Sequence, residues 1–521
     1  MKAITTAQMR ELDKVASTEF EIPGFELMRR AGEGVAATTR YLAERSRGGD
    51  AFVHLIAGRG NNGGDAFAAA LFLHEDDFEV EVLLAGSASD IRGDALRHLG
   101  KMRAAGIPLI ELPTKESWVD AMQDAGSGEI IVDGVLGIGV SGPPRGPIAG
   151  AIHYINNIAE DNLVISIDVP SGLDADTGEV PGEAVIADIT ATIGLPKIGL
   201  LTQQAIPYVG SLDVIGIGIP IELTSTYDSP RHLITGWDVR RLLTRRSNMA
   251  HKGDFGHVLV IGGAIGYAGA PAMAAMAALR SGAGLVTSLV PRPIYPVVAG
   301  AMLEVMTHPG EETDVGSLSA ASWEVWRSRL NDFTSIVVGP GMSPHPDTTA
   351  WIHHLLKECR RPLLLDADAL NVLAGNPERI AKAGCPVVIT PHPGELARLL
   401  GCSRDDVQRN REEAAREAAR RTKAVVVLKG AGTLVAQDGQ PLHMNMTGNP
   451  GMATGGTGDI LAGLIGGLLA QGLSPFDAAC TGVFLHGRAG DNAMWRRSQA
   501  SLTATDLIKE LGNVFREVSA R

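Results

Sequence analysis

One pattern recurs along the chain: a short apolar run, then a glycine-rich loop, then a segment with helical periodicity. In the first half, five runs rich in Val, Ile, Leu and Ala have the length of strands: 51–57, 79–85, 129–133, 163–168 and 187–193. In the second half, six runs share this character: 257–261, 285–290, 335–338, 362–366, 386–390 and 424–429. Continuously apolar strands are typical of sheets that are buried on both faces. The pattern therefore predicts an α/β fold, with mainly parallel sheets and helices on both faces.

Two domains are expected, because a chain of 521 residues exceeds the size at which single hydrophobic cores stop growing. The segment 217–246 interrupts the strand–loop–helix order with two prolines, a Ser/Thr cluster and a basic run. We place the boundary near residue 228, which gives domains 1–227 and 228–521. The halves share no residue-level repeat, so the sequence indicates a fusion of two different α/β domains.

Charge and composition exclude several classes of protein. The formal net charge of −13 argues against a general nucleic-acid binder, which needs a basic surface. The N-terminal residues lack the apolar segment of a signal peptide, and the most apolar stretch, 460–473, is too short to span a bilayer. The four cysteines lack CxxC spacing and are interpreted as reduced thiols. We expect a cytoplasmic protein that binds small molecules, with no nucleic-acid or membrane partner.

Apolar helix faces, such as residues 272–279, are either core or interface, and we expect a homo-oligomer. Glycine is in surplus, with 63 residues in the chain, and a GC-rich genome would also produce such a surplus. The positions of the glycines therefore decide its meaning. Many follow predicted strands, where the backbone approaches an anion or turns tightly into a helix: 58–64, 134–142, 262–269, 339–341, 430–432 and 448–458.

Three predicted strands of the first half end in polar loops. One runs into Gly58–Asp65, and the others end at Asp133 and Asp168. Since the carboxyl ends of parallel strands face one crevice, Asn62, Asp133, Asp168 and Ser171 are expected to converge there. Oxygen ligands without His or Cys suit a hard cation. Taken singly, each acid could instead cap a helix, and the glycine loop could be a tight turn.

These loops resemble a known family. The sequence NNGGD at 61–65, the stretches 133–139 and 168–172, the start at 7–13 and Pro196-Lys197 are similar to the N-terminal epimerase domain of the NAD(P)H-hydrate repair enzymes, over about residues 1–222. That family interconverts the two epimers of hydrated NADH and NADPH. The resemblance implies a Rossmann-like domain with potassium held by Asn62, Asp133 and Ser171. It also implies substrate contacts from Asn61, Asn62, Gly63, Gly64, Asp65, Gly137, Ile138, Gly139, Val140, Ser141, Gly142, Pro143 and Asp168.

The chemistry of this epimerisation agrees with an acidic site. A carbinolamine carbon can change configuration by loss of hydroxide and return of water to the other face. A general acid/base must then lie close to the hydroxyl group, and Asp168 is our candidate. The reaction needs no redox cofactor. The group that acts opposite Asp168 stays open at this point.

The sharpest signal in the second half is the run Thr447–Asp459, which precedes an apolar helix. Successive glycines before a helix N-terminus form an anion hole for phosphates. Asp459 falls in the first helical turn, where it can take a proton from an attacking hydroxyl group. The run lacks the Gly-Lys-Ser/Thr of a Walker loop and resembles the Gly-x-Gly-Asp signature of the ribokinase-like fold. The alternative is a glycine-rich seam for helix packing, in which the glycines would recur at helical spacing.

Other strand ends supply further polar groups. Lys429–Thr433 follows one strand and is placed to contact an adenine nucleotide. His392 and Glu395 follow another strand, where His392 can donate to a phosphate or substrate oxygen and Glu395 can organise a magnesium–water shell. Asp366 and Gly339–Gly341 also fall at strand ends.

With Lys252-Gly253, Gly262-Gly263 and Tyr267–Ala270, the run from about 250 to 515 resembles the C-terminal dehydratase domain of the same repair enzymes. That domain dehydrates the S epimer with ADP or ATP, and we expect ADP with Mg²⁺. The resemblance implies contacts with the hydrate from Ala270, Gly341, His392 and Asp459. It implies nucleotide contacts from Lys429, Gly430, Ala431, Gly432, Thr433 and Gly458.

The sequence thus predicts a bifunctional enzyme, an NAD(P)H-hydrate epimerase fused to an ADP-dependent NAD(P)H-hydrate dehydratase. In the dehydratase, Asp459 would deprotonate the ring hydroxyl, which attacks the terminal phosphoryl group, and AMP would be the by-product. The alternative is a vitamin or sugar kinase of the same fold, fused to a non-catalytic nucleotide-binding or protein-binding module. A kinase releases a stable phosphorylated product, whereas a dehydratase releases inorganic phosphate and restores the absorbance of NADH.

Overall fold

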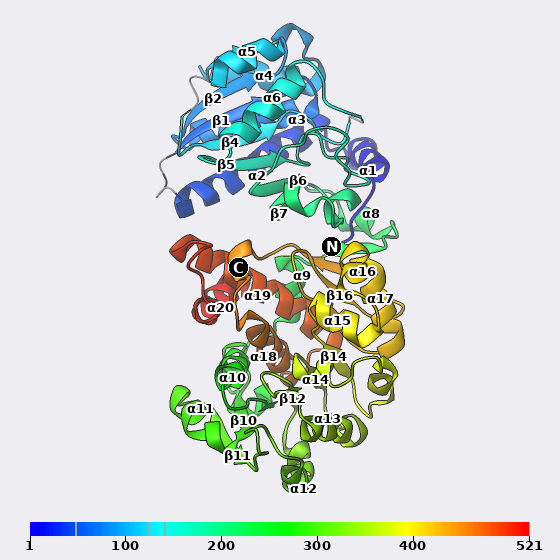
Figure 1. Cartoon of the computed structure of the whole chain (residues 1–521). Helices are drawn as coiled ribbons and strands as arrows, with labels where there is room; N and C mark the ends of the chain where they lie inside the picture. Colours follow the sequence, from blue (N-terminus) through cyan, green and yellow to red (C-terminus); the bar gives the residue numbers. More distant parts are fainter. Residues whose placement is uncertain (47–48, 50, 123–125, 140–141, 520–521) are drawn as a thin grey trace. The chain divides into compact units, whose positions relative to one another are not determined.

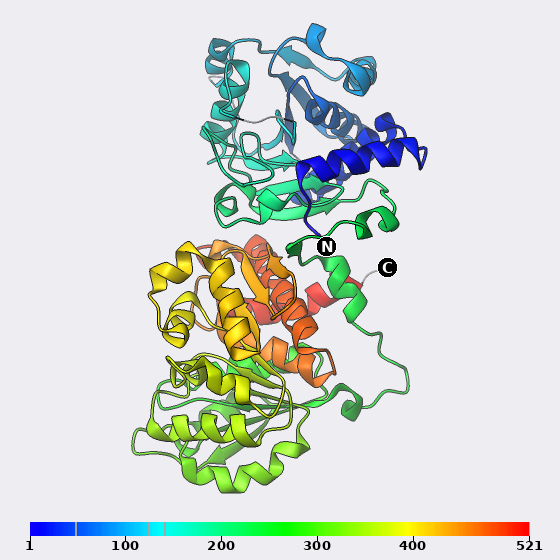
Figure 2. The same ribbon diagram turned by 90° about the vertical axis from the view of Figure 1, so that its right-hand side faces the viewer.

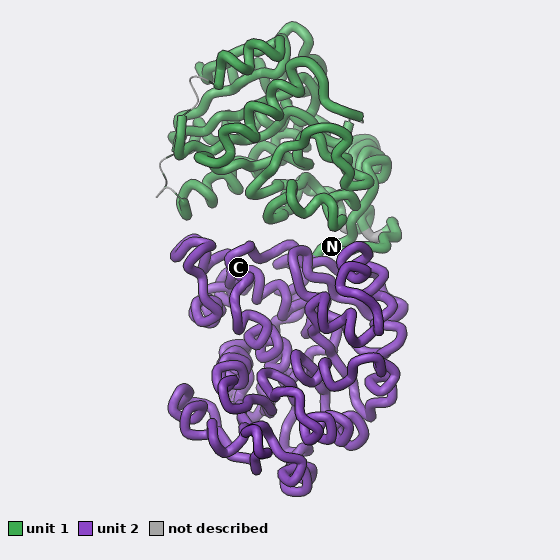
Figure 3. Tube along the Cα trace, in the orientation of Figure 1, with its two compact units in different colours: residues 1–233 green, residues 234–521 purple. Residues whose placement is uncertain are grey.

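In the computed structural model, the chain divides into two compact units, Met1–Leu233 and Ile234–Arg521 (Figure 3). The structure describes residues 1–46, 49, 51–122, 126–139 and 142–519. The boundary that we expect near residue 228 falls between α8 (Ile221–Ser225) and β8 (Arg231–Leu233), a few residues before this division.

A seven-stranded sheet forms the centre of the first unit, in the order β3-β2-β1-β4-β5-β6-β7. All of its neighbouring strands are parallel. The strands are β1 (Phe52–Ala57), β2 (Glu79–Leu84), β3 (Leu109–Glu111), β4 (Ile130–Gly134), β5 (Leu163–Ile167), β6 (Ile189–Ile193) and β7 (Ser211–Ile215). The order reverses between β1 and β4. Such a switch point opens a crevice outside the carboxyl ends of the two strands.

Helices cover both faces of this sheet (Figures 1 and 2). On one face, α3 lies on β1, β2 and β4 with α2 and α4 beside it. On the other face, α5 and α6 pack together over Ile56, Ile131 and Val164. The helices are α1 (Thr6–Thr18), α2 (Gly24–Ser46), α3 (Asn61–Glu75), α4 (Gly93–Ala104), α5 (Lys115–Ala121), α6 (Pro147–Ile158), α7 (Ile206–Val209) and α8.

The strands β9–β17 of the second unit lie side by side in one sheet, in the order β11-β10-β9-β12-β13-β14-β15-β16-β17. The pairs from β11 to β15 are parallel, whereas β15–β16 and β16–β17 are antiparallel. The strands are β9 (His257–Ile261), β10 (Leu285–Pro291), β11 (Met306–Gly310), β12 (Ser335–Val338), β13 (Leu363–Leu365), β14 (Val387–Ile389), β15 (Val425–Leu428), β16 (Thr433–Ala436) and β17 (Leu442–Asn445). The two sheets differ in order, and the prediction of two different, mainly parallel α/β domains is confirmed.

The apolar helix after the glycine-rich run is the central helix of the second unit. It is α18 (Thr457–Ala470), and all of its residues from Ile460 onward are buried. It packs against α10, α19 and the strands β9, β12 and β13. The other helices are α9 (Gly236–Leu242), α10 (Gly269–Arg280), α11 (Tyr295–Ala301), α12 (Trp323–Trp326), α13 (Pro346–Glu358), α14 (Asp368–Asn371), α15 (Pro393–Leu400), α16 (Arg404–Arg409), α17 (Arg411–Thr422), α19 (Pro475–Arg497) and α20 (Ala504–Ser519).

The apolar face at 272–279 belongs to α10 and packs into the core of the second unit. Burial in this core accounts for the apolar composition of the face, and no interface is needed to explain it. Within the described ranges, no helix has both the length and the apolar character that are needed to cross a membrane.

Candidate active sites

A cavity of about 1060 Å³ lies at the switch point of the first sheet. Its walls come from the start of α3, the loop after β4, the ends of β5 and β6, and α1; they include Asn61, Gly137, Asp168, Ile193 and Asp13. Small-molecule sites usually enclose roughly 300–1,000 Å³, so this cavity admits a ligand as large as a dinucleotide.

The loop after β1 enters α3 earlier than expected. Asn61–Asp65 form the first turns of the helix instead of a loop before it. A Cβ atom on Gly58 would lie 1.9 Å from the Val135 carbonyl oxygen, and one on Gly63 would lie 1.9 Å from the Gly58 carbonyl oxygen. Only glycine allows this packing, which brings the N-terminus of α3 and its unpaired N–H groups to the cavity.

Asp168 follows β5 in a left-handed conformation, with a φ of 67°. Such conformations are costly for residues other than glycine and cluster at functional sites. Its Oδ1 atom accepts hydrogen bonds from the Ile193 N–H (3.0 Å) and the Thr192 hydroxyl (3.4 Å), and it pairs with the buried ammonium group of Lys197. All of these partners use Oδ1. Oδ2 has no hydrogen-bond partner in the described part of the chain, so it is the oxygen available to a ligand.

Two more carboxyl groups line the same cavity, those of Asp13 and Asp65. Burial raises the pKa of Asp13 to about 6, with a further contribution from Asp168, although Lys197 acts in the opposite direction. Burial also raises the pKa of Asp65 well above its ordinary value. With Asp94, which also lines the cavity, the site therefore combines four carboxyl groups with a single buried ammonium group.

Asn62, Asp133 and Ser171 converge on the backbone of Leu136. The buried carboxylate of Asp133 accepts hydrogen bonds from the Ser171 N–H (2.9 Å) and hydroxyl (2.5 Å). The Ser171 hydroxyl oxygen accepts from the Leu136 N–H (2.8 Å), and the Asn62 amide donates to the Leu136 carbonyl (2.8 Å). In the described residues no three His, Cys, Asp or Glu side chains form a metal cluster. The donors here are one carboxylate with hydroxyl, carbonyl and amide oxygens, a set that suits a hard cation of low charge.

The residues expected to contact the substrate of the first unit occupy different places. The cavity wall contains Asn61, Asn62, Asp65, Gly137, Ile138, Gly139, Gly142, Pro143 and Asp168. Gly63 and Gly64 are buried inside α3, where Gly64 packs against Met28 and Ala95. Val140 and Ser141 lie outside the described residues.

Arg10, Asp13 and Lys197 also line the cavity. They belong to the stretches 7–13 and 196–197 that carry the family resemblance, but no role is predicted for them from the sequence. The Arg10 guanidinium donates to the Ile138 carbonyl (2.7 Å) and so holds the loop after β4. None of the three belongs to a glycine loop. The signal that could have found Asp13 and Lys197 is a charge among apolar neighbours, next to Leu12 and Leu195.

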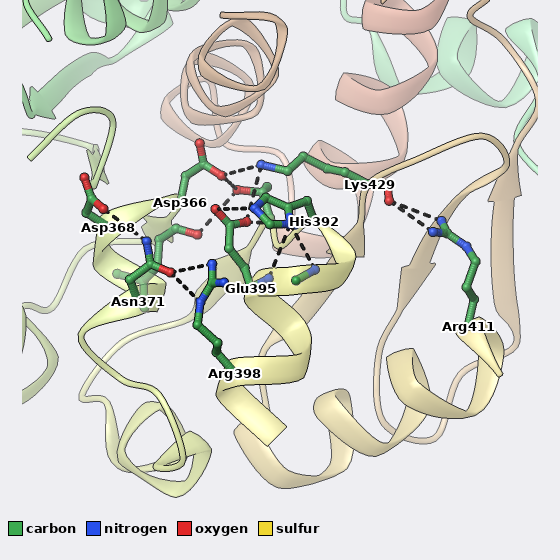
Figure 4. Close-up of polar contacts among 11 residues, drawn as sticks. Asp366, Asp368, Asn371, His392, Glu395, Arg398, Arg411 and Lys429 are labelled. Carbon is green, nitrogen blue, oxygen red and sulfur yellow. Dashed lines mark hydrogen bonds and ion pairs between the residues drawn. The ribbon is translucent and has the colours of Figure 1, made fainter. Parts of the chain in front are cut away.

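In the second unit, the loops after β13, β14 and β15 meet around Lys429 (Figure 4). The Lys429 ammonium lies 2.8 Å from Asp366 Oδ1 and 3.8 Å from Glu395 Oε2. The Thr390 hydroxyl also donates to Asp366 Oδ1 (2.7 Å). Burial opposes the charge of Lys429, but the two carboxylates outweigh it and raise the pKa of Lys429. A Cβ atom on Gly458 would lie 3.3 Å from the ammonium nitrogen, so Lys429 reaches the N-terminus of α18.

Asp459 lies in the first turn of α18, as predicted. Burial raises the pKa of Asp459 to about 7, and Asp366 and Glu395 add to this shift against the effect of Lys429. A proton acceptor works best when its pKa lies near the working pH. Asp459 is therefore suited to exchange a proton with a ligand at neutral pH.

His392 is the N-cap of α15. Its Nδ1 atom accepts from the N–H groups of Gly394 (3.0 Å) and Glu395 (3.3 Å), and Glu395 Oε2 accepts from the His392 N–H (2.8 Å). Because Nδ1 is an acceptor, the ring hydrogen lies on Nε2. The ring is 51% exposed, so Nε2 can donate to a ligand oxygen. Burial, with Lys429 and Arg398, lowers the pKa of His392, which favours this neutral ring.

Helix α19 holds the glycine-rich run in place. Asp491 accepts hydrogen bonds from the Gly448 N–H (3.0 Å) and from the Asn449 side-chain amide (3.1 Å). One turn earlier, His486 Nε2 lies 2.9 Å from the Thr457 carbonyl oxygen. Burial lowers the pKa of His486 to about 4, so the neutral ring donates to that carbonyl at physiological pH.

Of the remaining expected residues of the second unit, Gly341 and Gly430–Gly432 follow the strands β12 and β15, whereas Ala270 lies in the first turn of α10 and Gly458 in the first turn of α18. A Cβ atom on Gly341 would lie 3.1 Å from Ala270 Cβ, which places these two residues side by side. Lys429–Thr433 connects β15 with β16. The Arg411 guanidinium donates to the Lys429 carbonyl (3.2 Å), and the Thr433 hydroxyl donates to the Gly430 carbonyl (2.8 Å). These two bonds lie on either side of Gly430–Gly432, and the bond from Arg411 to the Lys429 carbonyl is drawn in Figure 4.

Two family models match the chain. Residues 24–199 match the one described as YjeF-related protein N-terminus, and residues 258–513 match the one described as NAD(P)H-hydrate dehydratase. The bifunctional NAD(P)H-hydrate repair enzyme of Moorella thermoacetica is 40% identical, over 99% of this chain and 97% of its own. The chain belongs to this family of bifunctional NAD(P)H-hydrate repair enzymes. The resemblance seen in the loop sequences is thereby confirmed, and the chain is an enzyme with an epimerase domain and a dehydratase domain.

Other NAD(P)H-hydrate repair enzymes match over a similar length. The one from Coxiella burnetii is 39% identical, over 97% of both chains. A solved ADP/ATP-dependent NAD(P)H-hydrate dehydratase from Bacillus subtilis, co-crystallised with ATP/Mg²⁺, is 30% identical; the match covers 55% of this chain and 98% of that one, with a TM-score of 0.48.

Proposed function

We propose that the first unit interconverts the R and S forms of hydrated NADH and NADPH, and that the second unit dehydrates the S form with ADP, releasing AMP and phosphate. Membership of the repair-enzyme family supports the pair of reactions. The observation that carries the residue assignment is the placement of an acid at the carboxyl edge of each sheet. Asp168 lines its cavity, and its Oδ2 atom has no hydrogen-bond partner among the described residues. Asp459 lies at the start of α18 with a pKa of about 7.

In the dehydratase, Asp459 takes the proton of the ring hydroxyl group. The hydroxyl oxygen then forms a bond to the terminal phosphorus of ADP, and the bond from that phosphorus to the bridging oxygen breaks, which leaves AMP. The lone pair of the ring nitrogen next expels the phosphate ester as inorganic phosphate. Loss of the proton on the neighbouring ring carbon completes the double bond of NADH or NADPH. The N–H groups of Gly455–Gly458 and the charge of Lys429 stabilise the transferred phosphoryl group.

We propose that Mg²⁺ accompanies the nucleotide. Hard carboxylate oxygens suit Mg²⁺, which commonly keeps several waters and binds one or two carboxylates with substrate phosphates. Asp366 and Glu395 supply such oxygens, and Glu395 would act through water because its Oε2 already accepts from the His392 N–H. When bound, Mg²⁺ neutralises charge on the phosphates. Lys429, Gly430–Thr433 and Gly458 would contact the nucleotide, and Ala270, Gly341 and His392 the hydrate.

In the epimerase, the ring hydroxyl leaves, the ring nitrogen supplies the electron pair, and water returns to the other face of the carbon. Asp168 exchanges the proton through Oδ2, while Lys197 and the Ile193 N–H hold Oδ1. The walls at Asn61–Asp65 and Gly137–Pro143 would contact the dinucleotide.

We also propose that K⁺ binds beside Leu136, held by Asn62, Asp133 and Ser171. The oxygen-rich donor set at this point supports it, because K⁺ prefers neutral oxygens with few carboxylates. Bound there, the ion would fix the loop after β4 against the substrate.

The described cysteines, Cys359, Cys385, Cys402 and Cys480, are all free, which supports the cytoplasm as the place of action. We propose a homo-oligomer, supported by the exposed apolar residues Val297 and Leu303 near the edge strand β11. Size-exclusion chromatography with light scattering measures that state.

The deciding experiment supplies the whole chain with mixed hydrate epimers, ADP and Mg²⁺. The expected result is complete return of the NADH absorbance, with AMP and inorganic phosphate in equal amounts. Without added ADP, the epimers should still exchange. A stable phosphorylated product without NADH would instead indicate a kinase.

A further inference from the structure

The cavity of the first unit contains carboxyl groups that the proposed reaction has not used. Asp168 is paired with Lys197. In contrast, the carboxyl groups of Asp13 and Asp65 make no hydrogen bond and no ion pair to any residue that the structure describes. Both nevertheless line the cavity. A partly buried carboxyl group without a protein partner is free to bind a ligand.

Helix α1 is built to present Asp13 to this cavity. Thr5 caps the helix in a capping box with Gln8, and the Thr6 N–H donates to Asp176 (2.7 Å). Leu12 and Ala16 are buried on the packed side. The cavity side shows Met9, Arg10, Asp13 and Ser17, which share one face at helical spacing. The bond from Arg10 to the Ile138 carbonyl fixes this face against the loop after β4.

Epimerisation needs two proton transfers on different faces of one carbon. One group must give a proton to the departing hydroxyl, and another must take a proton from the incoming water. A single carboxylate fixed by Lys197 and β6 cannot reach both faces without a large movement. Asp13 enters the cavity from α1, a different wall from the one that carries Asp168.

We propose that Asp13 is a second catalytic acid/base of the epimerase, which acts on the face of the ring carbon that Asp168 does not reach. This inference rests on the proposed epimerisation. In one direction, the Asp13 carboxylic acid gives its proton to the hydroxyl oxygen as the C–O bond breaks, and water leaves. The ring-nitrogen lone pair forms the C=N bond of an iminium ion. Water then adds to the other face, and Asp168 accepts its proton as the electron pair returns to nitrogen. The reverse reaction exchanges the two roles.

The charges around Asp13 fit this exchange. Lys197 and Asp168 act on it directly, and burial with these neighbours gives it a pKa of about 6. The other charged groups of the cavity are Arg10, Arg59, Asp65, Asp94 and Arg145. Asp65 is 9% exposed, and burial raises its pKa well above its ordinary value, which favours the protonated form that can donate a hydrogen bond. Asp13 is the carboxyl group that changes its protonation state near physiological pH.

The test compares Asp13→Asn with Glu11→Gln in the full-length enzyme. Glu11 is exposed on the same helix, so its change removes the same charge outside the cavity. Exchange of separated R and S hydrates is followed by chromatography, after subtraction of the rate without enzyme. Asp13→Asn is expected to lower epimerisation about 10²–10⁴-fold, the usual contribution of a general acid or base. Glu11→Gln should stay within twofold of the unchanged enzyme.

The pH profile separates catalysis from a structural role. Because the exchange of epimers takes up and releases no net proton, its two directions must share one pH profile. In both directions the rate should fall as pH rises through about 6, where the pair of acids loses the one proton that it needs. Asp13→Asn should remove this limb, while dehydration of pure S hydrate stays unchanged and reports a folded chain. If the unchanged enzyme does not exchange the epimers, the proposed function fails. If it does, but Asp13→Asn keeps the rate and the limb near pH 6, or Asp65→Asn alone abolishes exchange, the inference about Asp13 is overturned.

Discussion

Asp459 keeps its proton to a higher pH than an exposed aspartate, because it is buried beside Asp366 and Glu395. To act as the base that we propose, Asp459 must be deprotonated. We therefore expect the dehydration rate to fall as pH drops below about 7 and to reach a plateau above it. Asp459→Asn should reduce kcat by about 10²–10⁴-fold and remove this dependence. Both the loss of kcat and the loss of the pH dependence can be measured from the release of phosphate from S hydrate and ADP, over roughly two pH units on either side of neutrality.

A matched control for this prediction is Asp506→Asn in α20. Asp506 pairs with Lys509 and Thr503, and these partners lower its pKa, so its charge does not change near neutral pH. Its variant should keep the profile of the unchanged enzyme. An Asp459→Asn enzyme that retains normal turnover would show that another group takes the proton.

The chemistry of single residues was predictable where it coincided with a motif. Asp168 and Asp459 are proposed from the sequence because one ends an apolar run and the other follows a glycine-rich loop. The role proposed for Asp13 is not predictable from the sequence, because Asp13 lies in the middle of an amphipathic helix, where an acid normally faces water. Only the tertiary packing of α1 over the cavity distinguishes it. The role of His392 as a helix cap likewise depends on backbone geometry that composition does not reveal.

At the scale of elements, the prediction succeeded for strands that are buried on both faces. β4 and β12 are buried along their whole length, and both coincide with apolar runs that predict them, 129–133 and 335–338. The strands β3, β7 and β11 were missed. They lie toward the edges of their sheets, and exposed or half-buried residues break the apolar run. The hairpin β16–β17 was missed for a different reason: its antiparallel pairing arises from a local turn and not from a crossover.

The junction between β1 and α3 offers a test of element packing. Gly63→Ala places a methyl group 1.9 Å from the Gly58 carbonyl oxygen, where only a backbone shift makes room. We expect a loss of about 1–3 kcal/mol in the free energy of unfolding of the first unit, as for other overpacked sites. Epimerisation should fall too, since the shift moves Asn61 and Asn62. Urea denaturation, followed by a probe in the first unit, measures the stability.

Gly100→Ala is the matched control for this change. Gly100 lies inside α4, and a Cβ atom there would meet nothing within 4 Å. Alanine is favoured over glycine in a helix interior by about 0.5–1 kcal/mol, so this variant should be slightly more stable. Equal stability of Gly63→Ala and Gly100→Ala would contradict the close packing of Gly63 in α3 against the Gly58 carbonyl in the loop after β1.

For the whole molecule, the glycine surplus has two structural origins. Some glycines shape loops at the carboxyl edges of the sheets, as expected from their positions. Others allow helices to pack closely: a Cβ atom on Gly463 would lie 1.9 Å from the Ala274 carbonyl oxygen, and one on Gly467 would lie 1.9 Å from the Ser281 hydroxyl. The packing seam that was considered as an alternative to an anion hole therefore exists, one turn and more beyond Asp459. Composition could not separate these origins because each uses the same absence of a side chain.

Each unit has its own sheet and its own proposed catalytic acid. A substitution of one acid should therefore abolish one reaction and leave the other at its normal rate. Asp168→Asn should dehydrate S hydrate at the normal rate and leave R hydrate untouched, apart from spontaneous exchange. Asp459→Asn should exchange the epimers and form no NADH. An equal mixture of the two variants should restore full conversion of mixed hydrates, because the S hydrate formed by one chain can diffuse to another. The measurement is the NADH absorbance at increasing dilution. Recovery that fails at every protein concentration, while Asp168→Asn alone still dehydrates the S hydrate, would mean that Asp459→Asn has lost epimerisation and that the two reactions do not depend on separate acids.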